Sequence, residues 1–280
     1  MTADEPALKV SQTSAVPFPK RSAAVFAWFR WYARRYVAKR FHAVRLSRAG
    51  YAAGGRQPEG PVVVVVNHPA WWDPMIGLVL SDLWPDRVHV APIDSAALAR
   101  YGFFERVGFF GVEPGTARGG REFLRRSLSA LADPNAMLWV TAQGRFADVR
   151  ERPVALKEGV GHLAARLSRG HVLPLALEYS FWEESLPEAF ARFGSPLPLT
   201  AAGGTPGTWT DRIARALEET QDALAADVTS RDPSRFECLV AGGAGVGGVY
   251  DLWRRAKAAA RGRRFDSGHG RGIAATNDPS

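Results

Sequence analysis

The sequence predicts an α/β fold, with a mixed, largely parallel central sheet flanked by helices and an amphipathic helix near the N-terminus. Short apolar stretches of strand length alternate with helical stretches along most of the chain. One stretch, Val62–Val66, is five consecutive valines, and such a β-branched run is typical of a parallel strand covered on both faces. A chain of 280 residues is long enough to bury this sheet in one domain.

Four regions follow from the pattern along the chain. We expect residues 1–20 to be a disordered lead-in and residues 21–48 to form a basic aromatic helix. Residues 49–262 are expected to form the main domain, and residues 263–280 a disordered basic tail. The expected strands are 41–46, 62–66, 88–92, 109–113, 136–141, 172–177 and 236–240. The expected helices of the main domain are 75–83, 95–106, 116–132, 158–169, 208–228 and 250–261.

Residues 21–48 predict a helix, extending to about residue 44, that associates with a membrane surface. Aromatic and aliphatic residues recur there at helical spacing, and Trp28 and Trp31 widen this apolar side. The basic residues lie mostly elsewhere around the helix: Arg30, Arg34, Arg35, Lys39 and Arg40. One cationic and one aromatic face are typical of a helix lying in a membrane interface. The alternative is a terminal helix that packs on the domain and exposes its basic side.

The composition favours an anionic partner. The formal charge is +8 and the chain has nine tryptophans, a residue that favours membrane interfaces. No recognisable nucleic-acid module is present, so an anionic membrane surface is expected and nucleic acid is not. No stretch has the ~20 apolar residues of a membrane span, and the start does not resemble a signal peptide. We therefore expect a peripheral protein on the cytoplasmic face of the cell membrane.

A candidate catalytic pair follows the valine strand. The strand runs into Asn67 and His68, and Asp73 follows five residues after His68, just before a helix that begins near Pro74. In an open α/β sheet, the loop after a strand and before a helix is where ligands bind. The imidazole of His68 can act as a general base, with Asp73 fixing its tautomer. The alternative is that Asp73 only caps the helix and His68 is a satisfied polar residue.

Several other chemistries are excluded by missing motifs. No G-x-S-x-G elbow and no G-x-x-x-x-G-K-[ST] loop occurs, and the six histidines have no metal-ligand spacing. The single Cys238 rules out an internal disulfide and a Cys-based zinc site. Residues 243–248 match G-x-G-x-x-G, but no second strand of a βαβ unit follows them. We therefore expect no bound metal and no bound cofactor, and we expect His89 and His162 to be structural.

The stretch Asn67-His68-x-x-x-x-Asp73 after an apolar strand resembles the HX4D motif of the PlsC-like lysophospholipid and glycerolipid acyltransferases. By motif order the resemblance covers roughly 62–177. It implies that 49–262 is an acyltransferase domain, and that the chain is an O-acyltransferase moving a fatty acyl group from acyl-CoA or acyl-ACP to a lipid hydroxyl. It also implies that His68 is the base and that Asp73 orients it.

Two further blocks of the family are altered here. The family's second block ends in an arginine that holds acceptor phosphate, and the matching residue is Pro114. The third block, usually Phe-Pro-Glu-Gly-Thr-Arg, resembles 141–146, with Gln143 in place of Glu, Gly144 retained and Arg145 one position early. The resemblance implies that Asn67, Gln143, Gly144 and Arg145 bind substrate. Because the phosphate-binding arginine is missing, we expect an acceptor hydroxyl on a lipid without such a phosphate.

The predicted mechanism needs further groups. Backbone N–H groups at the Gly144 turn, or at the helix start 73–75, are candidate oxyanion donors. Trp71 and Trp72 are expected to line the pocket or to contact lipid. Two alternatives to acyl transfer remain open, a non-catalytic lipid-binding protein on the same fold and an acyl-thioester hydrolase.

Overall fold

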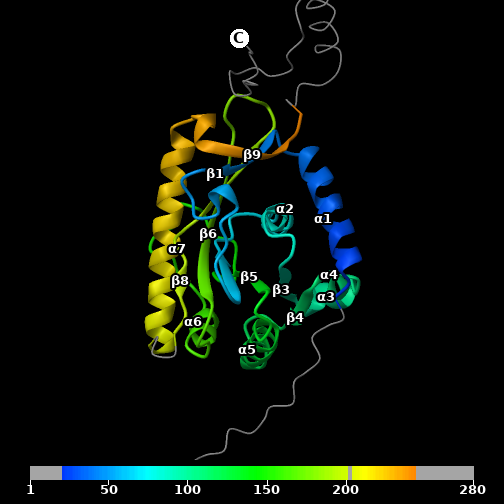
Figure 1. The fold of residues 1–280 in the computed structure, drawn as a ribbon, viewed down its shortest axis with the longest axis vertical. Helices are drawn as coiled ribbons and strands as arrows, with labels where there is room; N and C mark the ends of the chain where they lie inside the picture. The colour runs from blue at the N-terminus through cyan, green and yellow to red at the C-terminus, as the bar shows by residue number, and fades with distance from the viewer. Residues whose placement is uncertain (1–20, 201–203, 244–280) are drawn as a thin grey trace, which may run out of the picture.

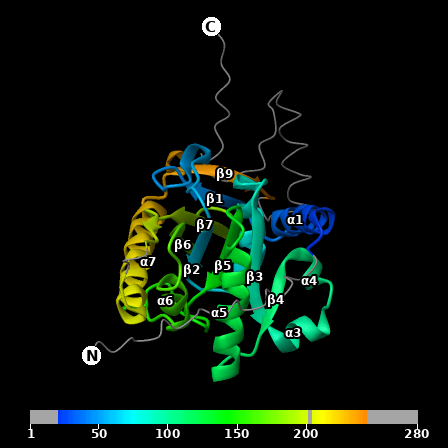
Figure 2. The ribbon, with the colours of Figure 1, turned by 60° about the horizontal axis from the view of Figure 1, so that its bottom comes forward.

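The computed structural model describes residues 21–200 and 204–243, and its fold is the predicted α/β fold (Figures 1 and 2). One mixed sheet has the strand order β4-β3-β5-β2-β6-β7-β1-β9, with β8 beside β6. The strands are β1 (Ala43–Ser47), β2 (Val62–Val66), β3 (Val88–Asp94), β4 (Phe109–Val112), β5 (Ala136–Thr141), β6 (His171–Ser180), β7 (Glu188–Phe193), β8 (Leu197–Pro198) and β9 (Phe236–Ala241). The helices are α1 (Ala23–Ala38), α2 (Asp73–Leu80), α3 (Ser95–Arg100), α4 (Phe104–Val107), α5 (Ala117–Leu131), α6 (Gly159–Ala164) and α7 (Pro206–Thr229).

Helices cover both faces of the sheet, and the valine run of β2 contacts both layers. Val62, Val64 and Val66 belong to a core that includes residues of α1 and α2. Val63 and Val65 belong to a second core with residues of α5, α6 and α7. Figure 1 shows α1 and α7 on opposite sides of the sheet. All five valines are buried, which is why the run has no polar alternation.

The parallel strands bring three chain segments to one edge of the sheet. β2 lies between β5 and β6 and is parallel to both. Val66 pairs with Thr141 on one side and with Leu175 on the other. The residues that follow these positions, which include His68 and Gln143, therefore meet at the carboxyl edge, where open α/β sheets bind ligands.

The other half of the sheet contains two strands that the sequence did not predict, β7 and β8. β7 is antiparallel to β6 and parallel to β1, and β1 is antiparallel to β9. The charged residues in the sequence of β7 are typical of a surface segment. In the structure, however, Glu188 is buried and forms an ion pair with Arg45 of β1. Because β1 lies inside the sheet, the sheet begins before residue 49, where the main domain was predicted to start.

Three predicted helices are shorter or broken. The helix predicted to extend to about residue 44 ends at Ala38, because the chain turns there to enter β1. The helix predicted at 95–106 is interrupted after Arg100, and the chain continues as α3 and α4. The helix predicted at 158–169 is the short α6, which ends well before Gly170. Gly170 itself has φ 94°, a left-handed conformation that favours glycine. The predicted lead-in 1–20, the tail 263–280, the helix 250–261 and most of the glycine run 243–248 lie outside the described residues.

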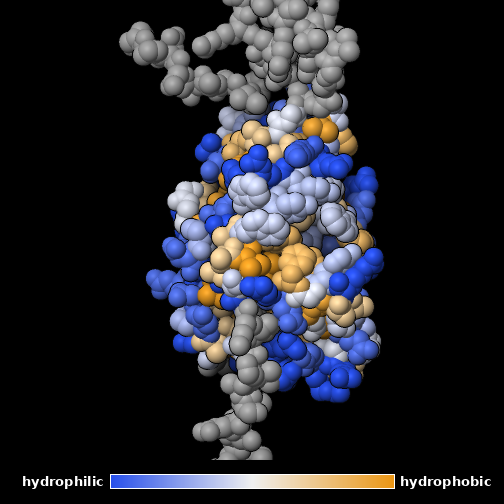
Figure 3. All heavy atoms as spheres, turned by 90° about the vertical axis from the view of Figure 1, so that its right-hand side faces the viewer, coloured by the Kyte–Doolittle hydropathy of each residue, from blue (hydrophilic) through white to orange (hydrophobic). Residues whose placement is uncertain are grey.

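Helix α1 packs along α2 and leaves several aromatic side chains exposed. Phe29, Ala33 and Val37 are buried in the core shared with α2. Trp28, Trp31 and Tyr32 are exposed. Figure 3 shows the face of the molecule over α1, where pale and orange residues gather in the middle and charged residues surround them. In the described part of the chain, no helix is long and apolar enough to cross a membrane.

The close approach of α5 to the end of β4 gives a stability prediction. A Cβ on Gly119 would lie 1.8 Å from the carbonyl oxygen of Glu113, so Gly119→Ala must displace α5. We expect a loss of about 2 kcal/mol or more in the free energy of unfolding. The neighbouring Gly120 has nothing within 4 Å, so the matched control Gly120→Ala should gain about 0.5–1 kcal/mol from helix propensity. Urea denaturation measures the free energy of unfolding of both variants. Equal changes in the two variants would contradict the close contact of Gly119 with Glu113.

Candidate active site

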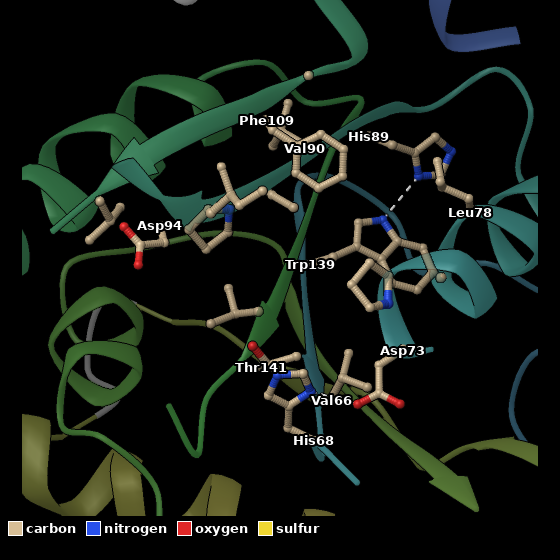
Figure 4. A pocket seen from close by; sticks show the side chains of 18 of the residues that line it. Val66, His68, Asp73, Leu78, His89, Val90, Asp94, Phe109, Trp139 and Thr141 are labelled. Carbon is tan, nitrogen blue, oxygen red and sulfur yellow. Dashed lines mark hydrogen bonds and ion pairs between the residues drawn. The ribbon is translucent and has the colours of Figure 1, made fainter. Parts of the chain in front are cut away.

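His68 and Asp73 face each other in the loop that joins β2 to α2 (Figure 4). His68 Nδ1 lies 2.6 Å from Asp73 Oδ2. Helix α2 starts at Asp73 itself, after the cap residue Trp72, which makes no side-chain capping bond. The same Asp73 oxygen accepts a hydrogen bond from the Ala70 N–H at 3.2 Å, on the side that precedes the helix. Asp73 therefore does not act as the N-cap of α2, which was the alternative interpretation.

Tyr179 of β6 holds the second oxygen of the same carboxylate. Its hydroxyl donates to Asp73 Oδ1 at 2.6 Å. Burial, followed by the neighbouring Asp73, raises the pKa of Tyr179 well above its usual value, so the phenol keeps its proton. We call Asp73, His68, Tyr179 and the Ala70 N–H the Asp73 cluster. Sequence reasoning missed Tyr179, although alternation along β6 puts it on the same face as Leu175 and Leu177.

The hydrogen bonds of the Asp73 cluster define which ring nitrogen of His68 is available. A carboxylate only accepts hydrogen bonds, so Nδ1 carries the proton that lies between His68 and Asp73. The neutral ring then has an unprotonated Nε2. The side chain of His68 is partly exposed, whereas that of Asp73 is almost fully buried. This arrangement can remove a proton from a ligand at Nε2 and stabilise the resulting imidazolium.

The backbone of His68 is fixed by the segment after β5. The His68 N–H donates to Gln143 Oε1 at 2.9 Å, and the His68 carbonyl accepts from the Ala147 N–H at 3.0 Å. The ring of Phe146 lies 4.4 Å from the His68 ring, centroid to centroid. Gln143 is buried and does not line the cavity described below. The structure therefore gives Gln143 a supporting position behind His68, in place of the predicted contact with substrate.

Asn67 also has a supporting position. Its Nδ2 donates to the Leu177 carbonyl at 2.9 Å, and its Oδ1 accepts from the Leu177 N–H at 2.7 Å. Both polar atoms of the amide are thus used within the chain, and the residue is 1% exposed. The predicted contact of Asn67 with substrate does not fit this geometry, because the side chain ties the end of β2 to β6.

Gly144 and Arg145 line the cavity, and their contact with substrate stays a prediction. Gly144 has φ 66°, and a Cβ there would lie 3.0 Å from the Lys157 side chain, so the turn requires glycine. The guanidinium of Arg145 is half-exposed, donates to the Phe146 carbonyl at 3.2 Å and forms an ion pair with Glu151. The positive charge of Arg145 is therefore already balanced.

The predicted oxyanion donors are used inside the chain. The Gly144 N–H donates to the Thr141 carbonyl at 3.1 Å and closes the turn. At the start of α2, the Met75 N–H donates to the Trp72 carbonyl at 2.9 Å, and the Asp73 N–H donates to the Ala70 carbonyl at 3.2 Å. Of the described residues that line the cavity, Arg145 is the one with a cationic donor group.

An apolar cavity of ≈ 610 Å³ extends from His68 into the space between the sheet and α2. Its walls come from β2 to β6 together with α1, α2 and the end of α4, and most of the wall residues are apolar. In Figure 4, His68 and Asp73 lie at one end of this cavity, and His89 and Phe109 lie at the other. Pro114 lines the cavity just beyond β4. A volume of this size suits one small-molecule chain or ring system.

His89 closes the inner end of the cavity as a neutral ring. Trp139 Nε1–H donates to His89 Nδ1 at 3.1 Å, and His89 Nε2–H donates to the Trp84 carbonyl at 2.9 Å. The ring of Phe26 stacks on it at 5.4 Å. Burial is the main cause that lowers the pKa of His89 to about 4. His89 is thus a satisfied structural residue, as predicted.

Neither tryptophan between the two catalytic candidates lines the apolar cavity. Trp71 is 65% exposed. Trp72 packs edge-to-face on Phe41, with ring centroids 4.9 Å apart. Contact with lipid remains a prediction for Trp71, whereas a role in lining this cavity is ruled out for both residues.

Scans of the chain against protein-family models and against curated proteins gave no match. The assignment of chemistry to the site therefore rests on the geometry and on the motif resemblance.

Exposed ionisable residues near the site form ion pairs. Arg150 forms an ion pair with Asp148 at 2.7 Å, and both are exposed. Within 21–200 and 204–243, no group of three or more His, Cys, Asp or Glu residues is arranged to hold a metal ion. The described site thus presents a proton acceptor and an apolar cavity.

Buried His89 predicts a pH dependence of stability. An unfolded histidine gains its proton below about pH 6.5, but folded His89 stays neutral until the pH approaches 4. Acid therefore favours the unfolded state, and the stabilisation, complete above pH 6.5, is lost progressively as the pH falls towards 4. The expected loss from this residue is about 3 kcal/mol. The free energy of unfolding is measured by urea denaturation at several pH values between 7 and 4. It should fall less steeply with falling pH in His89→Gln than in the wild type, whereas the control His162→Gln should follow the wild type.

Proposed function

We propose that the protein is an O-acyltransferase that moves a fatty acyl group from acyl-CoA or acyl-ACP to a lipid hydroxyl. The observation that supports this most is the Asp73 cluster at one end of an apolar cavity, since it combines a fixed base with space for an aliphatic chain. The order of His68, Asp73 and the turn at Gly144 agrees with the resemblance to PlsC-like acyltransferases.

The mechanism follows from the hydrogen bonds of His68. Nε2 removes the proton of the acceptor hydroxyl while its oxygen attacks the thioester carbonyl. Asp73, held by Tyr179 and Ala70, stabilises the imidazolium that forms. The developing oxyanion is assigned to the guanidinium of Arg145, which has to turn from its ion pair with Glu151 to donate to it. The tetrahedral intermediate collapses by breaking its C–S bond, and the proton on His68 passes to the departing thiolate.

The surroundings of the cavity support an acceptor without a phosphate next to its hydroxyl. By the motif resemblance, Pro114 takes the position of the family's phosphate-binding arginine, and Pro114 lines the cavity. Of the described residues that line the cavity, Arg145 alone carries a full positive charge, and Glu151 balances it. Binding a phosphate would require Arg145 to leave this ion pair. A neutral lipid hydroxyl can bind while this ion pair stays intact.

The exposed surface of α1 supports a peripheral position on an anionic membrane. Phe29 of α1 contacts Phe103 edge-to-face at 5.5 Å, so the exposed Trp28 and Tyr32 lie beside the exposed Phe103. Arg35 lies 5.0 Å from the Trp31 ring. Aromatic and cationic side chains on one surface are typical of interfacial binding (Figure 3).

The test of this proposal is turnover by the purified protein. The full chain is incubated with an acyl thioester and vesicles made from a membrane lipid extract, and thiol release and lipid products are measured together. We expect equal amounts of thiol and of one new ester. His68→Gln should lower the rate about 10²- to 10⁴-fold, while His162→Gln should leave it unchanged. Free fatty acid as the product would indicate a hydrolase, and lipid binding without thiol release would indicate a non-catalytic lipid-binding protein.

Tyr179 gives a finer prediction. Tyr179→Phe removes one hydrogen bond to the buried Asp73 carboxylate but leaves the apolar cavity intact. A hydrogen bond to a charged group contributes about 1.5–3 kcal/mol, so kcat should fall about 10- to 100-fold. KM for the thioester should change little. An unchanged kcat, or a loss confined to KM, would show that Tyr179 does not position Asp73.

A further inference from the structure

Thr141, the last residue of β5, supplies a hydroxyl group to the wall of the apolar cavity. Met137 and Trp139 of the same strand belong to the core layer that contains residues of α1 and α2. Because side chains alternate along a strand, Thr141 points to this layer as well. Figure 4 shows its side chain at the His68 end of the cavity.

The register of the sheet places this hydroxyl close to the loop that carries His68. Thr141 pairs with Val66 of β2, and Val66 pairs with Leu175 of β6 on its other side. All three residues line the cavity, so they form one row across the sheet, in which neighbouring strands are about 4.8 Å apart. His68 follows Val66 by two residues and lines the same cavity. The hydroxyl and the imidazole therefore border the same end of the cavity.

The Thr141 hydroxyl is available to a ligand. It makes no hydrogen bond with any other described residue, and Thr141 is half-buried, so water can satisfy the group until a substrate replaces it. Other polar groups of the cavity wall are engaged within the chain. The Ser81 hydroxyl donates to the backbone of α2 at 2.7 Å, and Arg145 is paired with Glu151. Thr141 thus offers a neutral donor that can bind without breaking an interaction of the chain.

We propose that the Thr141 hydroxyl donates a hydrogen bond to the carbonyl oxygen of the acyl thioester. This inference rests on the proposed function and adds a substrate-binding residue to it. The unprotonated Nε2 of His68 is an acceptor and pairs with the hydroxyl of the acyl acceptor, whereas a thioester carbonyl only accepts and needs a donor. Arg145 has to turn from its ion pair with Glu151 to donate, but Thr141 does not.

The hydrogen bond from Thr141 becomes stronger during the reaction. As the acceptor oxygen attacks the carbonyl carbon, its proton passes to His68 Nε2 and one electron pair of the C=O bond moves onto the carbonyl oxygen. Thr141 keeps its own proton and donates to the oxyanion. When the C–S bond breaks, the C=O bond forms again, and His68 gives its proton to the thiolate. The hydroxyl of Thr141 should therefore stabilise the transition state more than the bound substrate.

The first test is kinetic and uses the isosteric variant Thr141→Val. Valine keeps the shape and β-branching of threonine but has no donor, and it suits a strand. We expect kcat for acyl transfer to fall about 10- to 100-fold, with a smaller rise in KM for the thioester. Thr141→Ser keeps the hydroxyl and should keep most of the activity. Thr229→Val, at the exposed end of α7, is the matched control and should leave the rate unchanged.

The second test measures binding and needs no turnover. S-dodecyl-CoA lacks the carbonyl oxygen of dodecanoyl-CoA, whereas the ketone analogue with a methylene group in place of the sulfur keeps it. Calorimetry gives the Kd of both analogues for the full-length wild type and for Thr141→Val. We expect the wild type to bind the ketone about three- to tenfold more tightly than the thioether, and Thr141→Val to lose this difference. Thermal unfolding checks that each variant is folded.

The outcomes separate the role of Thr141 from the proposed function. Wild-type turnover that Thr141→Val leaves unchanged would overturn the role of Thr141 while acyl transfer stands. A preference for the ketone that Thr141→Val abolishes, in a protein that releases no thiol, would support the hydrogen bond and contradict acyl transfer. A preference that Thr141→Val retains, binding of neither analogue, or equal losses of activity in Thr141→Val and Thr141→Ser would overturn the inference.

Discussion

The site depends on one constraint, a nearly fully buried carboxylate that must have its hydrogen bonds satisfied. Asp73 accepts from His68 and the Ala70 N–H on one oxygen and from Tyr179 on the other. These donors come from the loop after β2 and from β6, so the carboxylate joins two neighbouring strands at the sheet edge. Removing a donor would leave part of a buried charge without a partner, which is far more costly than losing an exposed hydrogen bond. His68 is oriented as a consequence.

The need to satisfy hydrogen-bonding groups also explains the residues around His68. Asn67 bonds the backbone of β6, Gln143 bonds the backbone of His68, and Gly144 allows the tight turn that brings Phe146 against the imidazole. None of these residues needs to touch a ligand to matter, because together they fix the ring whose Nε2 we propose as the proton acceptor. The valine strand beneath them is covered on both faces, so this edge is built on a fully buried strand.

The sequence was most informative where local composition decides the structure. β2 and β5 begin and end at the predicted residues, because their apolar runs admit no other placement. β7 was missed because Glu188 and Arg192 look like surface charges, and their partners Arg45 and Asp227 are distant in sequence. Tyr179 was missed for a similar reason, since its partner Asp73 is 106 residues away. Asn67 and Gln143 were predicted to bind substrate, but the structure shows that their side chains bond the backbone.

The central claim is that His68, Asp73 and Tyr179 act as one unit on the same proton transfer. A double-mutant cycle of His68→Gln and Tyr179→Phe, measured as kcat/KM for acyl transfer, tests it directly. If Tyr179 acts only through Asp73 and His68, Tyr179→Phe will slow the wild type but will cause no further loss in the His68→Gln background. Fully additive losses, or an unchanged rate in either single variant, would contradict the claim.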